Sequence, residues 1–186
     1  AKSSEMRDRA LKLFLRARNY GLRGLELDHR GITQRLKLMP DSAAREIKVK
    51  ELPMLYWTAA SWGSAINLGK DRAELLADLG AVRALMERGL KLDETFDGGA
   101  FHEAMIVLEA LPKDLGGSPE RAREHFQRAV ELSKGNKASP YLTLAQTVSV
   151  LTQNRREFRE LLEQALAVDP EREPGNRLAT LILQQQ

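Results

Sequence analysis

The sequence predicts an all-α fold, arranged as an array of helical hairpins in an α-solenoid. Strong helix formers abound, whereas the β-branched residues Val, Ile and Thr are sparse. Apolar residues recur at the i, i+3, i+4 and i+7 spacing of an amphipathic helix, and strand-like alternation is absent over any useful length. Four short segments also resemble one another. Three stripes with helical spacing are Ala10, Leu13, Phe14, Ala17; Leu55, Ala59, Trp62, Ile66; and Leu161, Leu162, Ala165, Leu166.

The four similar segments each place a small residue three positions after an apolar one, followed by aliphatic residues. A small residue lets a neighbouring helix approach closely, and the aliphatic side chains fill the seam beside it. The segments are GLRGLELDH (21–29), MERGLKLDE (86–94), FQRAVELSK (126–134) and LEQALAVDP (162–170), with Gly24, Gly89, Ala129 and Ala165 as their small residues. They predict second helices of repeats near residues 10–28, 78–93, 119–133 and 155–169, within a single domain over residues 1–186.

The connections support this order of helices. The second of these helices follows an insertion, NLGKDRAELLADLG, in which we expect DRAELLAD to form a short extra helix. Before the third, two glycines turn the chain, Ser118 has the residue type of an N-cap, and Pro119 suits the first helical position. Helix–turn–helix units of this kind resemble degenerate tetratricopeptide repeats, whose ideal length is about 34 residues. The positions that match the repeat are Trp62, Gly89, Ala122, Phe126, Ala129, Leu162, Ala165 and Pro170.

Composition excludes several classes of protein. The chain has 186 residues and no cysteine, which excludes a disulfide scaffold, thiolate metal sites and cysteine nucleophiles. A hydrophobic content of 42% is too high for a disordered chain. No apolar run reaches the roughly 18 residues of a membrane span. The polar start, AKSSEMRDR, holds no signal peptide, although a mature chain would have lost one.

Longer segments give a more specific resemblance, in their order and spacing, across most of the chain. They are LKLFLRARNYGLRGLEL (11–27), LYWTAASWGSAINLGKD (55–71), ALMERGLKLDETFDGGAFHE (84–103) and ALPKDLGGSPERAREHFQRAVELS (110–133). With these segments the chain resembles the T-component family of TRAP transporters, the tripartite ATP-independent periplasmic transporters. The resemblance implies a tetratricopeptide-like periplasmic lipoprotein that works beside the solute-binding P-component, assembles as a homotrimer, and holds a small organic ligand in a cleft or channel.

The family pattern also includes a lipobox cysteine and a helical stretch before LKLFLRAR, and this chain carries neither. We therefore expect attachment to the membrane only through a lipid anchor of the full-length protein. The identity of the ligand is not implied, beyond an apolar or amphipathic character.

Residues 55–68 contain the candidate ligand-lining side chains. On a helical wheel, small residues beside the apolar stripe leave a groove with Tyr56 at one end, Asn67 at the other and Trp57 on a flank. Pockets for small organic molecules are mainly apolar with a few polar groups, and Trp and Tyr suit their walls. We predict that these three residues line the ligand passage. In the alternative interpretation, Tyr56 and Trp57 only cover the seam between repeats.

The DGGAFHE turn is a further candidate. Gly98 and Gly99 permit positive φ, so a tight helix-to-helix turn explains their presence. His102 joins the predicted ligand-lining residues because it can reach a ligand carboxylate, although a structural or surface histidine is the simpler interpretation. The three histidines of the chain share no metal-ligand spacing, and we expect no metal, no cofactor and no enzymatic activity.

Charge is distributed unevenly along the chain. Residues 1–50 hold 13 Lys or Arg against 6 Asp or Glu, a net charge of +7, whereas the remaining residues carry −4. A basic segment is typical of proteins that bind nucleic acids or anionic surfaces. Here the arginines are spread out without interleaved stacking aromatics, so we favour a solvated helix face and expect no nucleic-acid partner. A generic tetratricopeptide scaffold, which captures a peptide or protein in its concave face, is the alternative to the transporter role.

Overall fold

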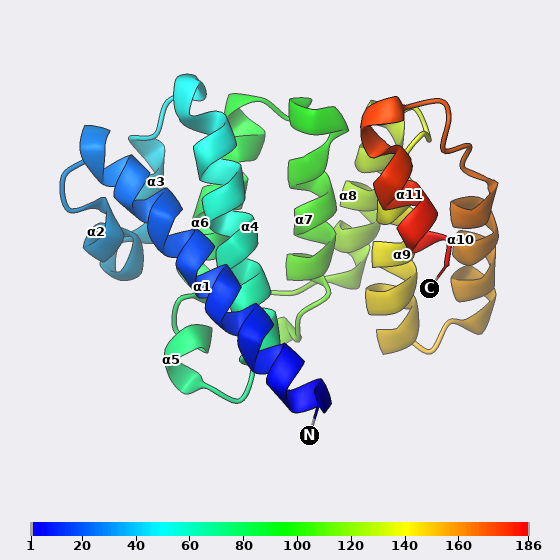
Figure 1. Cartoon of the computed structure of the whole chain (residues 1–186), viewed down its shortest axis with the longest axis horizontal. Helices are drawn as coiled ribbons and strands as arrows, with labels where there is room; N and C mark the ends of the chain where they lie inside the picture. The colour runs from blue at the N-terminus through cyan, green and yellow to red at the C-terminus, as the bar shows by residue number, and fades with distance from the viewer. Residues whose placement is uncertain (1, 186) are drawn as a thin grey trace. The chain divides into compact units, whose positions relative to one another are not determined.

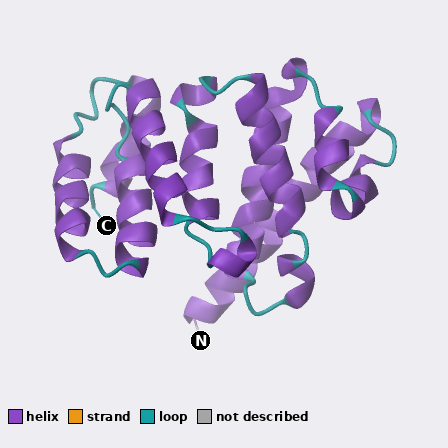
Figure 2. Ribbon diagram, turned by 180° about the vertical axis from the view of Figure 1, so that it is seen from behind, coloured by secondary structure: helices purple, strands orange, loops and turns teal. Residues whose placement is uncertain are grey.

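The computed structural model describes residues 2–185, and this part of the chain forms helices joined by loops, with no strand (Figure 2). The all-α class predicted from the sequence is therefore confirmed. The sequence was interpreted as one domain, and the helices group into two compact units, one ending at Asp93 and the other beginning at Glu94. Each unit is described by itself.

The first unit begins with a long helix and ends with the helix predicted near residues 78–93. Its elements are α1 (Lys2–Asp28), α2 (Ile32–Leu38), α3 (Pro40–Arg45), the 3₁₀ turn η1 (Val49–Glu51), α4 (Leu52–Leu68), α5 (Ala73–Leu76) and α6 (Leu79–Leu92). The short helix α5 lies within DRAELLAD, as expected.

The packing of α1 across α4 forms the centre of the first unit (Figure 1). Gly21 lies so close to α4 that an added Cβ atom would overlap Oγ1 of Thr58 and lie 2.9 Å from its Cβ. An added Cβ on Gly24 would likewise overlap Sδ of Met54. Small residues at these two positions therefore let the helix axes approach closely.

The apolar stripe of α4 is buried, as its spacing predicts: Leu55, Ala59, Trp62 and Ile66. The indole of Trp62 is fully buried, and its Nε1–H donates to Oδ2 of Asp78 at 3.2 Å. The cationic groups of Arg18 and Lys37 lie 5.3 and 5.9 Å from the centroid of the ring. The polar atom of this large side chain is thus satisfied inside the core.

On α1, the buried residues differ from the stripe that helical spacing suggests. Leu11, Leu22 and Leu25 are buried, whereas Leu13 is 55% exposed and Phe14 is 36% exposed. Apolar side chains occur on more than one side of this helix, so spacing alone does not select the buried side. The position of α4 selects it instead.

The second unit continues the alternation of helices and short turns. Its elements are η2 (Phe96–Gly98), α7 (Ala100–Glu109), η3 (Lys113–Leu115), α8 (Pro119–Leu132), α9 (Ser139–Leu144), the π-helical turn η4 (Ala145–Ser149), α10 (Arg155–Ala167), η5 (Pro174–Asn176) and α11 (Arg177–Leu183). Its core includes Ile106, Ala122, Tyr141, Leu144, Val148, Leu161 and Ala165.

Two local predictions in this unit are confirmed. Oγ of Ser118 accepts a hydrogen bond from the backbone N–H of Arg121 at 3.3 Å, and Pro119 opens α8. Gly98 and Gly99 have φ angles of 60° and 91°, values that favour glycine, at the tight turn before α7.

The residues assigned to repeat positions fall on these helices and their ends. Ala122, Ala129 and Ala165 are buried, as are Trp62 and Gly89 in the first unit. Three others are partly buried: Phe126, Leu162 and Pro170. The predicted second helices lie in α1, α6, α8 and α10.

Candidate functional site

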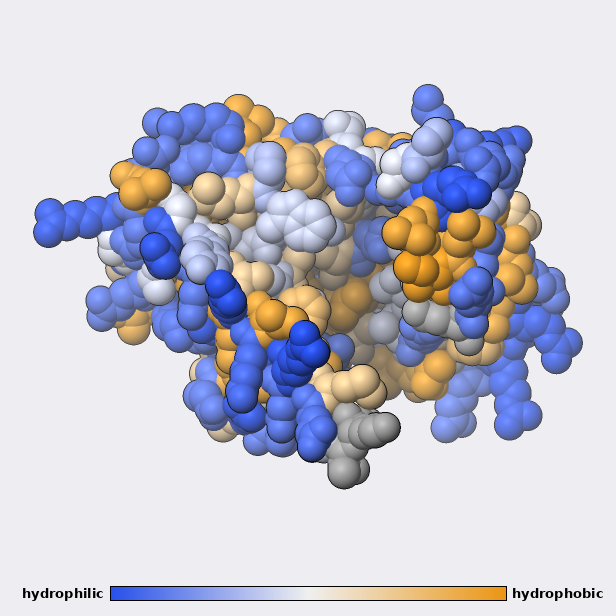
Figure 3. All heavy atoms as spheres, in the orientation of Figure 1, coloured by the Kyte–Doolittle hydropathy of each residue, from blue (hydrophilic) through white to orange (hydrophobic). Residues whose placement is uncertain are grey.

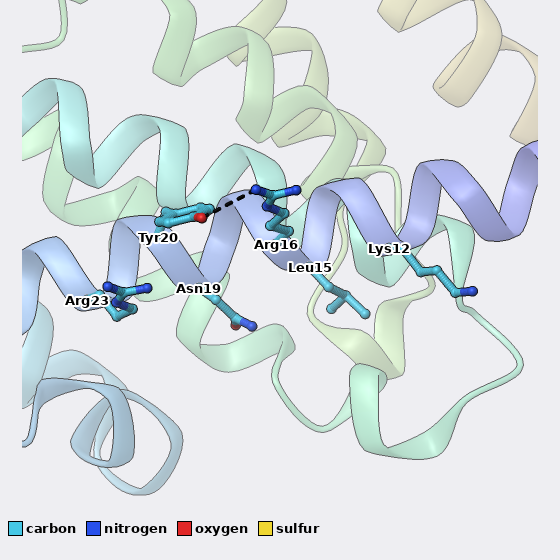
Figure 4. A pocket seen from close by; sticks show the side chains of 6 residues that line it. All are labelled: Lys12, Leu15, Arg16, Asn19, Tyr20 and Arg23. Atoms are coloured by element: carbon cyan, nitrogen blue, oxygen red, sulfur yellow. Dashed lines mark hydrogen bonds between the residues drawn. The ribbon is translucent and has the colours of Figure 1, made fainter.

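The side of α1 that faces away from α4 carries the first candidate site. Side chains at four-residue and three-residue intervals project from one side of a helix, and here they border an open groove of about 390 Å³. Figure 4 shows all of the labelled lining side chains extending from this one helix. They are Lys12, Leu15, Arg16, Asn19, Tyr20 and Arg23.

Tyr20 lies between two guanidinium groups in this groove. Arg16 donates from Nη2 to the phenol oxygen of Tyr20 at 3.4 Å (Figure 4), and this bond lowers the pKa of Tyr20. The guanidinium carbons of Arg16 and Arg23 lie 5.6 and 5.4 Å from the centroid of the Tyr20 ring. Within residues 2–185, neither arginine pairs with a carboxylate. The groove is therefore suited to carboxylates supplied from outside the unit.

The sequence-based interpretation missed this arrangement. It treated the arginines of the first fifty residues as spread out, and it found no aromatic residue interleaved among them. A sequence signal was present nevertheless, because Arg9, Arg16 and Arg23 follow one another at intervals of seven. That interval places them on one side of a helix.

A second groove, of about 420 Å³, lies in the second unit beside η4 and α10. Its apolar wall includes Val150, Phe158 and Leu162, and its polar rim includes Asn154 and Arg159. A mainly apolar groove with a few polar groups at its edge is typical of sites for small organic molecules. From the sequence, Leu162 is predicted only as a repeat position, and this segment carries no predicted function.

The three ligand-lining residues predicted on α4 lie along its surface. Tyr56 and Trp57 meet edge to face, with ring centroids 5.1 Å apart, and Trp57 is 67% exposed. Asn67 is exposed and lies about 15 Å further along the helix axis than Trp57. None of the three lines either of the two grooves described above. Their role in binding a ligand stays a prediction.

The fourth predicted residue, His102, belongs to a polar cluster in the second unit. Its Nδ1 lies 2.9 Å from Nδ1 of His125, so one of these nitrogens donates and the other accepts. Its Nε2 lies 3.1 Å from Oε2 of Glu94. Hydrogen bonds from Arg128 first, and from His102 second, lower the pKa of Glu94 to about 2. Both ring nitrogens of His102 therefore have partners within its own unit.

The described residues have two further properties that concern metal binding and membrane insertion. In residues 2–185, no group of three or more His, Cys, Asp or Glu side chains is arranged to hold a metal ion. Over the same residues, every helix is too short or too polar to span a bilayer.

Comparison with known proteins gives two findings. The family model described as TRAP transporter T-component matches residues 1–186. A curated relative from Treponema pallidum (strain Nichols), which bears the name "Uncharacterized protein", is 26% identical over 186 residues. The alignment covers 97% of this chain and 58% of the relative, so the chain spans little more than half of the relative's length.

Proposed function

Because the chain belongs to the TRAP transporter T-component family, we propose that it docks the solute-binding P-component of such a transporter and binds a small apolar or amphipathic molecule. The family match over residues 1–186 carries this proposal. The proposed action is binding without catalysis: the protein shelters a molecule and exchanges it with the P-component. The proposed compartment is the periplasm, where a TRAP solute-binding component works.

A surface on the first unit supports the docking role, and a groove in the second unit supports the binding of a small molecule. The outward side of α1 exposes apolar and cationic side chains together, which suits contact with another protein. The groove bordered by Val150, Phe158 and Leu162 has the apolar walls that suit a small organic molecule. The side chains of Tyr56, Trp57 and Asn67 on α4 are the alternative ligand contacts.

Two further parts of the proposal rest on the family resemblance alone. They are a homotrimeric assembly and a lipid anchor in the full-length protein. Sedimentation velocity tests the first, since a trimer predicts three times the monomer mass of 20.9 kDa. A protein that stays monomeric at high concentration contradicts it.

Docking is tested with the purified P-component from the same organism, immobilised for surface plasmon resonance. We expect saturable binding of the T-component, and an unrelated periplasmic binding protein serves as the control surface. Equal binding to both surfaces, or to neither, refutes the docking role. Recovery of a P-component from a periplasmic extract, with this protein as bait, is the matching experiment at native concentrations.

Ligand binding is tested with N-phenyl-1-naphthylamine, a neutral apolar fluorophore. Val150→Glu places a charge at the groove of the second unit, and Leu178→Glu is the matched control, since both residues are exposed and Leu178 lies outside the groove. Loss of binding in Val150→Glu alone assigns the site to this groove. Loss in the double variant Tyr56→Ala, Trp57→Ala assigns it to α4. No binding to the wild-type protein contradicts the ligand-binding role for apolar molecules.

A further inference from the structure

The outward side of α1 is organised in three adjacent rows, each with a spacing of seven residues. Residues seven apart project in nearly the same direction from a helix, so each row forms a line along its surface. The rows are Arg9, Arg16 and Arg23; Met6, Leu13, Tyr20 and Leu27; and Ala10, Ala17 and Gly24, of which Gly24 lies at the boundary with α4, against Met54.

The row of large apolar residues is exposed along its whole length. Met6 is 66% exposed, Leu13 and Tyr20 are each 55% exposed, and Leu27 is 87% exposed. This row extends for roughly 30 Å along the helix. Figure 3 shows hydrophobic patches beside hydrophilic side chains along the diagonal that α1 follows in Figure 1.

The apolar row and the row of small residues together have the spacing of a helix-packing seam. From Met6 to Leu27, the two rows alternate at intervals of four and three residues. When two helices pack side by side, residues spaced alternately four and three apart insert their side chains between the side chains of the facing helix. Ala10 and Ala17 leave room for large side chains of a partner, whereas Met54 of α4 occupies the space beside Gly24. Between Met6 and Tyr20, the seam therefore fits a second helix better than it fits a flat surface.

The arginine row selects the chemistry of that helix. Arg9, Arg16 and Arg23 are exposed along one edge of the seam, and none of them pairs with a carboxylate in the part of the chain that the structure describes. In an antiparallel pair of α1 helices, this row would face its own copy and like charges would repel. In a parallel pair it would face the row of Arg7, Phe14, Gly21 and Asp28, where Gly21 is covered by α4 and the one carboxylate, on Asp28, already pairs with Lys50 at 2.8 Å.

We propose that the outward face of α1 docks an amphipathic helix of a partner protein, with apolar residues at the seam and Asp or Glu along the edge that meets the arginine row. This inference rests on the proposed docking role, for which it supplies the surface and the chemistry of the partner. Arginine and carboxylate groups form charge-assisted pairs at such an edge, while the apolar row supplies the buried area.

The experiment uses synthetic four-heptad helical peptides with an identical apolar seam and with Glu, Gln or Lys at the flanking positions. Fluorescence anisotropy measures their binding to the whole chain. We expect the Glu peptide to bind about tenfold or more tightly than the Lys peptide, with a preference that weakens as salt is added. Because the chain has no cysteine, Leu13→Cys provides a single attachment point that should cross-link to the bound Glu peptide.

Two triple variants with equal losses of charge test the location. Arg9→Gln, Arg16→Gln, Arg23→Gln should weaken binding of the Glu peptide about tenfold. The control carries Lys113→Gln, Lys134→Gln, Arg172→Gln at exposed positions of the second unit that lie outside its groove, and it should bind as the wild type does. Leu13→Ser with Tyr20→Ser removes part of the seam and should weaken all three peptides, and circular dichroism checks that each variant keeps its helices.

The outcomes separate this inference from the docking role itself. Equal binding of the Glu and Lys peptides, or equal weakening by both triple variants, overturns the inference. If the P-component binds the wild type but binding is unchanged in the α1 variants, docking stands and this surface is wrong. If the Glu peptide binds at α1 but the P-component does not bind at all, the docking role fails while the surface chemistry stands. A mass that falls toward the monomer in the seam variant shows that a second copy occupies the face, which also overturns the inference.

Discussion

Helix α1 of the first unit and helix α8 of the second both carry several arginines, but the guanidinium groups have different partners. Three arginines on α8 each pair with a carboxylate on another element of the second unit, and Arg128 also pairs with Glu131 on α8 itself. The pairs that join different elements are Arg121 with Glu109, Arg123 with Glu157 and Arg128 with Glu94. On α1, Arg16 and Arg23 lie against the ring of Tyr20 instead.

The comparison teaches that arginine content alone does not indicate what a helix surface does. The arginines of α8 connect neighbouring elements, so they contribute to the stability of the second unit. On α1, Arg7 and Arg18 also pair with carboxylates, at Asp71 and Asp78. Arg16 and Arg23 contribute little to folding, because their charges meet no carboxylate in the described residues. Four predictions test this distinction, ordered from the largest expected effect to the smallest.

The largest loss of stability is expected when Arg121, the partner of the buried Glu109, is removed. Glu109 is only 2% exposed. Arg121 donates to its Oε2 from Nε at 2.9 Å and from Nη2 at 2.7 Å. Arg121→Ala removes two charge-assisted hydrogen bonds from a buried carboxylate, so we expect the free energy of unfolding to fall by about 3 kcal/mol. Urea unfolding followed by circular dichroism measures it. Arg16→Ala on α1 is the control, with a change within about 0.5 kcal/mol, and equal losses would contradict the distinction.

A second prediction locates the stabilising side of α1. Gly21→Ala forces its new methyl group against Thr58, where Cβ at 2.9 Å and the backbone Cα at 3.3 Å do not move by side-chain rotation. We expect a loss of about 2 kcal/mol in the free energy of unfolding. Gly24→Ala meets only the flexible end of Met54, and the higher helix propensity of Ala offsets that contact by up to about 1 kcal/mol. Thermal unfolding should therefore give a clearly lower Tm for Gly21→Ala than for Gly24→Ala. The same Tm for both variants would contradict the close packing at Gly21.

Breaking the ion pair between Arg123 and Glu157 should destabilise the protein less than the two substitutions above. Nε and Nη2 of Arg123 donate to the two carboxylate oxygens at 2.8 and 3.1 Å, and the two side chains are partly exposed. Because solvent screens such a pair, we expect Arg123→Gln to lower the free energy of unfolding by about 1 kcal/mol. Arg23→Gln on α1 should produce no measurable change in the same urea titration.

The smallest effect concerns acid stability. Arg128 and His102 lower the pKa of Glu94 from 4.5 to about 2 in the folded protein. The folded state therefore binds fewer protons at Glu94 than the unfolded state does between these values, and the stabilisation present above pH 4.5 is lost as the pH falls toward 2. Glu94→Gln should show a shallower decline in the free energy of unfolding than the wild type over this range. If the free energy of unfolding of the two proteins declines in parallel, the interaction of Glu94 with Arg128 and His102 does not stabilise the folded state.

Glu103 sets a useful contrast for the acid titration. Burial raises the pKa of its carboxyl group, so its contribution to stability runs in the opposite direction as the pH falls. The total pH dependence of the protein therefore mixes opposing effects. The difference between wild type and Glu94→Gln isolates the one that belongs to the arginine pair.

Several local features were predictable because they depend on residues close together in the chain. Helical spacing identified the buried stripe of α4, and the residue types at Ser118 and Pro119 identified the start of α8. The glycines before α7 identified a turn. Each of these depends on backbone geometry within a few residues, which a sequence specifies directly.

The candidate sites were less predictable. The partners of His102, at Glu94 and His125, are 8 and 23 residues away, and no spacing rule joins them. The groove beside Val150 forms only when η4 and α10 pack together. The exposed row on α1 was predictable as a periodicity, but whether Leu13 or Leu11 faces the core was not.

By itself, the sequence determined the all-α class, the places of several helices and the family resemblance, since these follow from residue types and spacings along the chain. Only the tertiary structure decided which side of each helix is buried and which charges are paired. The physical reason is that α1 has apolar residues on more than one side, and the close approach of α4 at Gly21 covers one side and leaves Tyr20 and its arginines exposed. Burial and ion pairing depend on neighbours distant in sequence, which helical periodicity does not encode.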